Sequence, residues 1–269
     1  MIRNLFLRHN LLRFWLTVGI WVGIAIVVTL IPINGFAHSP SIKATTTAKF
    51  TFPSVIPDAN PLYVIGGGGE LFTFSKTGKT TCGAYAMAES VVAPGSGPPP
   101  HIHHHANEWF YFPEGGIMLM HGSNLFPTMK DVPGVTTPKE RIHLQVTPPG
   151  SIYYSSKQHL HGYVNSSNKS RKMISVWSTD EANIGISSYF SASSPQVIDP
   201  LKPPIITSQD RDSYVTQGPK YEINQSAHFW EYVDSVDYNF PKMDAHLDEL
   251  QALLAPDLPG GKPRQCQNK

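Results

Sequence analysis

The stretch Gly95-Ser-Gly-Pro-Pro-Pro-His101-Ile-His103-His-His-Ala-Asn-Glu108-Trp-Phe-Tyr111 carries the strongest structural signal in the chain. Alternate side chains of a β-strand point to the same face, so His101 and His103 are expected to face the same way. A turn over residues 106–107 would return Glu108 on the adjacent strand, facing the same space. Imidazole and carboxylate groups are good ligands for first-row divalent metals. The stretch therefore predicts two metal-binding strands.

The surrounding sequence predicts an all-β domain. Short runs rich in aromatic and β-branched residues recur from Leu62 to Trp177, and turns rich in Gly and Pro separate most of them. No long amphipathic helix lies between these runs, which favours a sandwich or a barrel. We place this domain at residues 61–192.

The C-terminal extension, residues 193–269, has a different composition, because it is rich in Pro and polar residues. One helix is expected near 241–254, where apolar residues recur at helical spacing from Met243 to Leu254. Packing on the outside of the barrel is the expected role of this helix; binding a partner is the alternative.

The histidine motif resembles the first motif of the cupin superfamily, in which His-x-His is followed by four residues and Glu. A second cupin motif follows Gly150, because His161 and Asn165 fall at its expected offsets. The resemblance spans roughly residues 62–190, about half of the chain. It implies a jelly-roll β-barrel with a C-terminal extension, in which one divalent metal ion is held by four ligands: His101, His103, Glu108 and His161.

Two residues depart from the cupin pattern, because Ser156 and Gln158 stand where Pro and Gly are usual. They shape the turn before the fourth ligand and so affect its direction. His159, two residues before His161, is a rival for that role, and His161 is preferred because its distance to Gly150 and Asn165 fits the motif. The neighbours His104 and His105 are expected outside the ligand set.

Four further residues share the faces or motifs of the ligands. Asn165 would either orient a ligand or satisfy backbone groups. The parity of Phe110, Phe112 and Tyr163 matches that of the ligands, so these rings would line the cavity or pack in the core.

Within the superfamily, the motif residues are most similar to the quercetin 2,3-dioxygenase-like group, and one pair of motifs indicates a monocupin. This resemblance implies a metal-dependent dioxygenase that takes dioxygen and an enol or flavonol-like small molecule, with Glu108 as the catalytic base. The absence of thiolate ligands favours iron, manganese, nickel, cobalt or copper, and zinc also fits. A non-catalytic protein that binds a metal or small molecule, and a metal-dependent isomerase, are the alternatives. A homodimer is compatible with the fold.

The N-terminal segment, residues 1–37, predicts export. Three arginines precede Phe14–Ile33, a run without charged residues. It is expected to be a signal peptide cleaved before His38, or a retained membrane anchor, with a buried soluble helix as a third reading. Residues 38–60 have the composition of a linker. The domain would then be secreted or periplasmic, or anchored outside the cytoplasm.

Charge and cysteine content add two expectations. The 21 basic and 20 acidic residues nearly balance, which gives no reason to expect a nucleic-acid partner. Cys82 and Cys266 are the two cysteines, and in an exported chain they would either pair or remain separate thiols.

Overall fold

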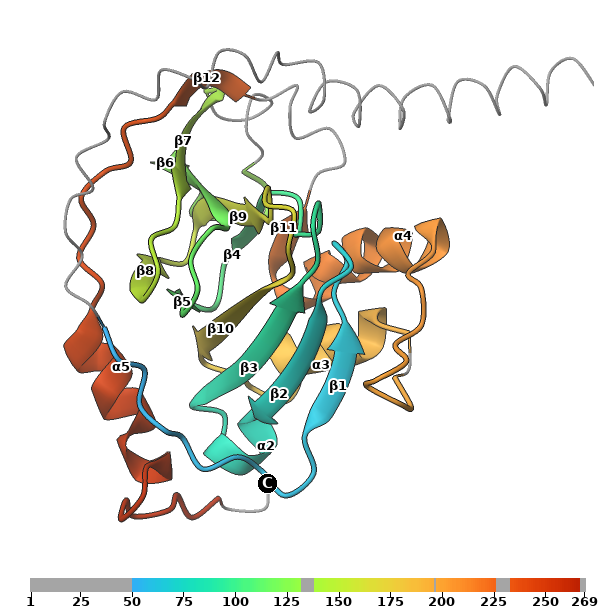
Figure 1. Ribbon diagram of the computed structural model, residues 1–269, viewed down its shortest axis with the longest axis vertical. Helices are drawn as coiled ribbons and strands as arrows, with labels where there is room; N and C mark the ends of the chain where they lie inside the picture. Colours follow the sequence, from blue (N-terminus) through green and yellow to red (C-terminus); the bar gives the residue numbers. More distant parts are fainter. Residues whose placement is uncertain (1–49, 132–137, 196, 226–232, 267–269) are drawn as a thin grey trace, which may run out of the picture. The chain divides into compact units, whose positions relative to one another are not determined.

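Strands dominate the computed structural model, which describes residues 50–131, 138–195, 197–225 and 233–266 (Figure 1). In these residues two six-stranded sheets form the jelly-roll barrel that the sequence predicts. The first sheet has the order β1 (Leu62–Ile65), β2 (Leu71–Lys76), β3 (Tyr85–Val92), β10 (Arg171–Ser178), β5 (Glu108–Phe112) and β8 (Ser151–Ser155). The second has the order β11 (Ile223–Gln225), β4 (His101–His103), β9 (His159–Val164), β6 (Met118–Leu125), β7 (Glu140–Val146) and β12 (Val233–Asp237).

Both faces of strand β5 are covered, which explains why it is aromatic at almost every position. Phe110 and Phe112 point into the barrel and pack in one buried cluster with Tyr163. Trp109 points to the other face, where it is fully buried against Leu250 of the C-terminal extension. A strand buried on both sides reads as a continuous apolar run.

The prediction that Glu108 returns on the strand adjacent to His101 and His103 was wrong. Strand β4 belongs to the second sheet and β5 to the first, so Glu108 faces the histidines across the barrel. The reason lies in the connecting residues, which do not form a hairpin. His104 N–H donates to the carbonyl of Glu222, and Asn107 O accepts from Ser178 N–H, so this segment bonds to other parts of the chain as it crosses between the sheets.

The C-terminal extension supplies both edge strands of the second sheet. Strand β11 pairs antiparallel with β4, and β12 pairs parallel with β7. The extension therefore holds more regular structure than the one helix expected from the sequence. The helices of the barrel domain are α2 (Gly78–Thr81) and α3 (Ile186–Ser193). Those of the extension are α4 (Ser208–Gln217), η2 (Gly218–Tyr221), α5 (Leu247–Leu254) and η4 (Ala255–Asp257).

Helix α5 is the helix predicted near 241–254, and it begins at Leu247 rather than at Pro241. Leu250 and Leu254 are fully buried against the outer face of the first sheet. Packing on the outside of the barrel, the expected role, is therefore what the structure contains.

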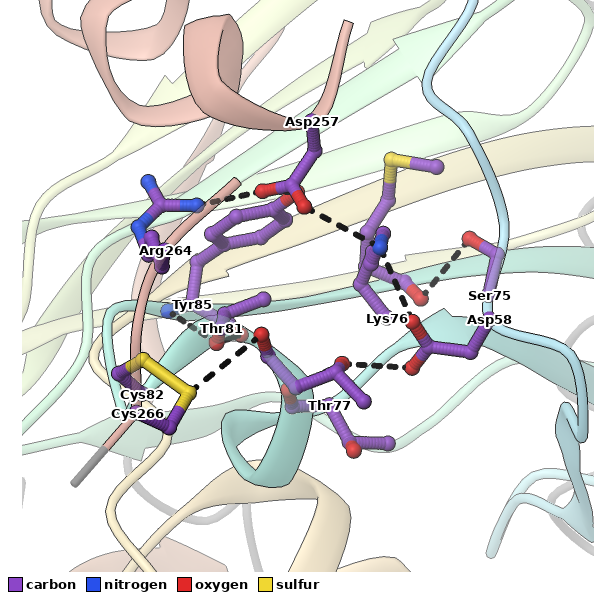
Figure 2. A network of polar contacts seen from close by, with 12 residues as sticks. Asp58, Ser75, Lys76, Thr77, Thr81, Cys82, Tyr85, Asp257, Arg264 and Cys266 are labelled. Carbon is purple, nitrogen blue, oxygen red and sulfur yellow. Dashed lines mark hydrogen bonds and ion pairs between the residues drawn. A yellow bond between two sulfur atoms is a disulfide. The ribbon is translucent and has the colours of Figure 1, made fainter. Parts of the chain in front are cut away.

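The C-terminal tail is tied to the barrel by a disulfide and an ion-pair network, which we call the latch: Asp58, Lys76, Asp257, Arg264 and the Cys82–Cys266 disulfide (Figure 2). Lys76 Nζ lies 2.9 Å from Asp58 Oδ1 and 3.1 Å from Asp257 Oδ1. Arg264 pairs with the other oxygen of Asp257. Every charge in the latch thus has a partner of opposite sign.

Residues 50–60, predicted as part of a linker, hold no helix or strand but pack on the barrel. The rings of Phe50 and Phe52 contact Tyr111 at centroid distances of 5.9 and 5.4 Å. The segment therefore covers the outer face of the first sheet rather than running free.

The predicted signal or anchor at 1–37 and the first part of the linker lie outside the described residues. Among the helices that the structure does describe, none has the length and apolar character needed to cross a bilayer.

Candidate metal centre

A row of histidines crosses the second sheet on the face that points into the barrel. His101 lies directly opposite His161, which lies opposite His121, and His121 in turn lies opposite His143. Residues directly opposite each other in an antiparallel pair point to the same side of the sheet. Strands β4, β9, β6 and β7 therefore present their imidazoles as neighbours, although the sequence separates them widely.

Four side chains converge at one end of this row. The ligand atoms of His101, His103, Glu108 and His161 all lie within 4.8 Å of one another. Glu108 Oε2, from the opposite sheet, lies 3.2 Å from His161 Nε2 and 3.7 Å from His103 Nε2. The structure thus brings together all four ligands that the sequence predicts, and none is more than 8% exposed.

Backbone carbonyls set the tautomers of two of these imidazoles. His101 Nδ1 donates to the carbonyl of Pro99 at 3.0 Å, and His161 Nδ1 donates to the carbonyl of His159 at 3.1 Å. A carbonyl can only accept, so the proton lies on Nδ1 and the lone pair of Nε2 points into the group. This is the arrangement in which an imidazole binds a metal through Nε2.

Several buried atoms of the group lack hydrogen-bond partners among the described residues: Nδ1 and Nε2 of His103, and Nε2 of His161. An unsatisfied buried polar atom costs about 1–3 kcal/mol, so a folded protein rarely retains several together without a use for them. A divalent cation would satisfy the Nε2 lone pairs and the carboxylate at once. The group therefore fits a transition-metal ion, and it can hold one.

Burial also sets the charge of the group. It lowers the pKa values of His101 and His161 to about 4, and lowers that of His103. It raises the pKa of Glu108 to about 8, because the carboxylate loses its hydration. At neutral pH the imidazoles are therefore neutral, which is the form that binds metals.

The rival histidines have other contacts. His159 Nδ1 lies 2.7 Å from Ser156 Oγ, and its ring stacks on His121 at 5.8 Å. His104 is buried on the other side of β4, with Nε2 3.2 Å from Asn224 Nδ2. His105 is half-buried, 3.9 Å from the carboxylate of Glu181. These three imidazoles lie outside the group of four.

The departure from the cupin turn is accommodated at Gln158. This residue has φ +68°, a left-handed conformation that favours the glycine usual at this position. Its N–H donates to the carbonyl of His103 at 2.7 Å. The turn that precedes His161 is therefore bonded directly to the ligand strand β4, which keeps the fourth ligand aimed at the other three.

Asn165 satisfies backbone groups, one of the two roles considered for it. Its Nδ2 donates to the carbonyls of Val92 and Lys169 at 2.8 and 2.7 Å, and its Oδ1 accepts from Ser167. None of these hydrogen bonds goes to a member of the group of four. It shapes the turn between β9 and β10.

The three predicted aromatic residues lie inside the barrel next to the ligands. The ring of Phe110 contacts that of His161 at 5.8 Å and that of Tyr163 at 6.0 Å, and Phe112 packs in the same buried cluster. Phe110 also lines a cavity beside His161, whose volume is about 10 Å³.

Two residues of the C-terminal extension, Phe240 and Met243, line the same cavity. Sequence reasoning missed them, because they follow the second motif by more than 70 residues and belong to no motif. No pattern in the chain indicates that this segment returns to the barrel interior.

A family model described as Cupin matches residues 60–202, more than half of the 269-residue chain. This chain therefore belongs to the cupin family. No curated protein matches it in sequence.

Solved structures are similar to this chain only at low sequence identity and low TM-score. An oxalate oxidase is 19% identical with a TM-score of 0.32, and the match covers 52% of this chain and 64% of that protein, less than two thirds. KdgF from Halomonas sp. is 14% identical with a TM-score of 0.32, covering 49% of this chain and 97% of that one. A Klebsiella pneumoniae protein with a double-stranded β-helix domain is 15% identical with a TM-score of 0.29, covering 48% and 84%. Likenesses at this level carry no conclusion about activity.

Proposed function

We propose that this chain is a metal-dependent oxidoreductase, a dioxygenase that acts on a small enol or flavonol-like molecule. The observation that carries the proposal is the buried group of three imidazoles and one carboxylate, in which Nε2 of His103 and Nε2 of His161 have no hydrogen-bond partner among the described residues. Three histidines and a carboxylate leave coordination positions open, which a catalytic metal needs and a purely structural metal does not. The donor set suits iron, manganese, nickel, cobalt or copper, and zinc also fits.

Glu108 is the proposed proton acceptor. Its carboxylate is buried beside the three imidazoles, with Oε2 3.2 Å from His161 Nε2, so it would lie next to a molecule bound to the ion and could accept the proton of an enol. A bound metal would supply Lewis acidity and redox chemistry at this site. Glu108 would then hold the substrate proton, while His101, His103 and His161 hold the ion.

The lining of the cavity supports an uncharged substrate. Most of it is made by aromatic and apolar side chains, with Ser155, His121 and His161 as the other members, and no Lys or Arg is among the described residues that line it. A site for a dicarboxylate or a phosphorylated sugar would need such cations to offset the desolvation of the anion. Apolar walls such as Phe110 also exclude water from a reactive intermediate.

Oxygen uptake tests this function. The purified chain, loaded in turn with each candidate metal, is mixed with quercetin in an oxygen-electrode cell. We expect uptake by the wild type and by His105→Ala, and loss of uptake in His103→Ala. The matched control removes a histidine from the same run without touching the group of four. No uptake with any metal, in a protein that binds metal, would exclude the dioxygenase.

A non-catalytic metal-binding protein is the second candidate, and the size of the cavity favours it. About 10 Å³ is the room of one water molecule, far less than a flavonol occupies. A stoichiometric metal together with no turnover on any enol would support this reading.

An exported location is proposed for the domain. The Cys82–Cys266 disulfide supports it, because such bonds persist outside the reducing cytoplasm. Thiol alkylation of intact cells followed by mass spectrometry tests it: the two cysteines remain unlabelled if the chain is exported, and become labelled without added reductant if it stays in the cytoplasm.

A further inference from the structure

The cavity beside His161 is closed on one side by the C-terminal extension. Its volume of about 10 Å³ leaves no room for an organic substrate. Four of the residues that line the cavity lie on strands: Phe110, His121, Tyr153 and His161. Two others, Phe240 and Met243, belong to the C-terminal extension. Through this cavity, a molecule larger than water can therefore reach His161 only if one of these walls moves.

The strand walls are fixed by continuous hydrogen-bonded ladders, whereas the wall from the extension is fixed only at its ends. At one end, His143 Nδ1 donates to the carbonyl of Asn239 at 3.0 Å. At the other, Trp109 Nε1 donates to the carbonyl of Ala245 at 2.9 Å. Between them, residues 240–244 form no backbone hydrogen bond to the rest of the described chain. This segment is the wall that can move at the lowest cost.

Side-chain exposure also indicates that this segment is held weakly, because most of its side chains face solvent. Tyr238 is 61% exposed and its neighbours Asn239, Pro241 and Lys242 are exposed as well, while Phe240 is half-buried. The Phe240 ring lies edge-on to Tyr153 at a centroid distance of 5.6 Å, and it contacts the ring of His121 at 6.0 Å. One phenyl ring thus closes the cavity from the solvent side and holds the middle of the segment in place.

We propose that residues 238–246 form a lid over the metal centre, and that Phe240 determines the size of the molecules that enter. The lid opens by withdrawing the Phe240 ring from Tyr153 and His121, while the bonds at Asn239 and Ala245 act as fixed ends. Met243, also half-buried, follows the ring and completes the closed wall. This inference rests on the proposed metal centre for its biological meaning, but the lid itself can be tested without metal.

The first test uses the metal-free full-length protein and diethyl pyrocarbonate, which acylates accessible imidazoles. The rate of modification of His161 is followed by peptide mass spectrometry. Half-burial of a phenyl ring stabilises the closed lid by a factor of about ten. We therefore expect Phe240→Ala to accelerate modification about tenfold, Phe240→Leu to give a smaller increase, and Tyr238→Ala to leave the rate unchanged. Equal rates in the wild type and both Phe240 variants, with native circular dichroism spectra, would overturn the lid.

The second test uses protein loaded with cobalt(II), whose visible spectrum reports ligand binding. Azide, imidazole and 4-phenylimidazole form a series of increasing size. We expect Phe240→Ala to accelerate the binding of 4-phenylimidazole about tenfold and that of azide less than about twofold, because only the larger molecule needs the open lid. An equal acceleration for all three ligands contradicts a size-selecting role. Failure of the wild type to bind cobalt would remove the proposed function, while the acylation test would still decide the lid.

Discussion

Two polar clusters of this chain differ in whether their charges have partners. In the latch, Lys76 lies between Asp58 and Asp257, and Arg264 completes the network (Figure 2). In the group of four, three imidazoles face one carboxylate, and several imidazole nitrogens have no hydrogen-bond partner within the described part of the chain. A cluster whose polar atoms are all satisfied needs nothing from outside, whereas one with orphaned lone pairs implies an absent ligand. The first is therefore assigned to stability and the second to binding.

Removal of the disulfide is the change to the latch that we expect to lower the free energy of unfolding most. The bond closes a loop across a sequence separation of 184 residues, which contains strands β3 to β12. The chain-entropy account gives a loss of about 5 kcal/mol in the free energy of unfolding for the double variant Cys82→Ala/Cys266→Ala. Denaturant unfolding measures this loss. Metal content should stay unchanged, and loss of metal from a folded double variant would show that the two clusters are not independent.

Substitution of Lys76 tests the latch without touching the disulfide. Lys76→Met removes the shared cation and leaves Asp58 and Asp257 close together with one positive charge fewer, so we expect a loss of about 3 kcal/mol. Lys172→Met, on an exposed position of β10, is the matched control and should change stability by less than about 0.5 kcal/mol. Equal melting temperatures for both variants would mean that the ion pairs contribute nothing.

The pH dependence of the metal-free protein isolates Glu108. Its pKa is about 8 when folded and 4.5 when unfolded, so the folded state binds more protons between these values and stability falls as pH rises. The histidine pKa values are lowered, so protonation of these imidazoles reduces stability only below pH 6.5. Above pH 6.5 the buried carboxyl groups titrate, and Glu108 contributes more than Glu70. From pH 6.5 to 8 we expect a loss of about 2 kcal/mol.

Glu108→Gln should remove the larger part of this slope, and saturating metal should do the same, because the ion holds the carboxylate ionised. Thermal denaturation at several pH values measures it. The same slope in Glu108→Gln would assign the titration to another group, such as Glu70, whose pKa burial raises to about 7.

The convergence of the group of four could be predicted from the sequence because its signals are local. Strand periodicity aligned His101 with His103, and motif spacing selected His161 over His159. The partner sheet of Glu108 could not be predicted, because the bonds of His104 and Asn107 to distant segments decide that the chain crosses between sheets.

In the C-terminal extension, less of the structure could be predicted from the sequence. Its apolar spacing predicted helix α5, but strands β11 and β12 are three and five residues long and acquire their structure by pairing with barrel edges. Phe240 carries no signal at all, because its role depends on the fold that brings it back to His121 and Tyr153.

Elemental analysis of the purified chain tests the central claim most directly. The wild type, His103→Ala and His105→Ala are exposed to the same mixture of divalent transition metals, passed through a desalting column and measured for metal per chain. We predict one ion in the wild type, one in His105→Ala and loss of the ion in His103→Ala. Equal metal in all three proteins, or none in the wild type, would contradict it.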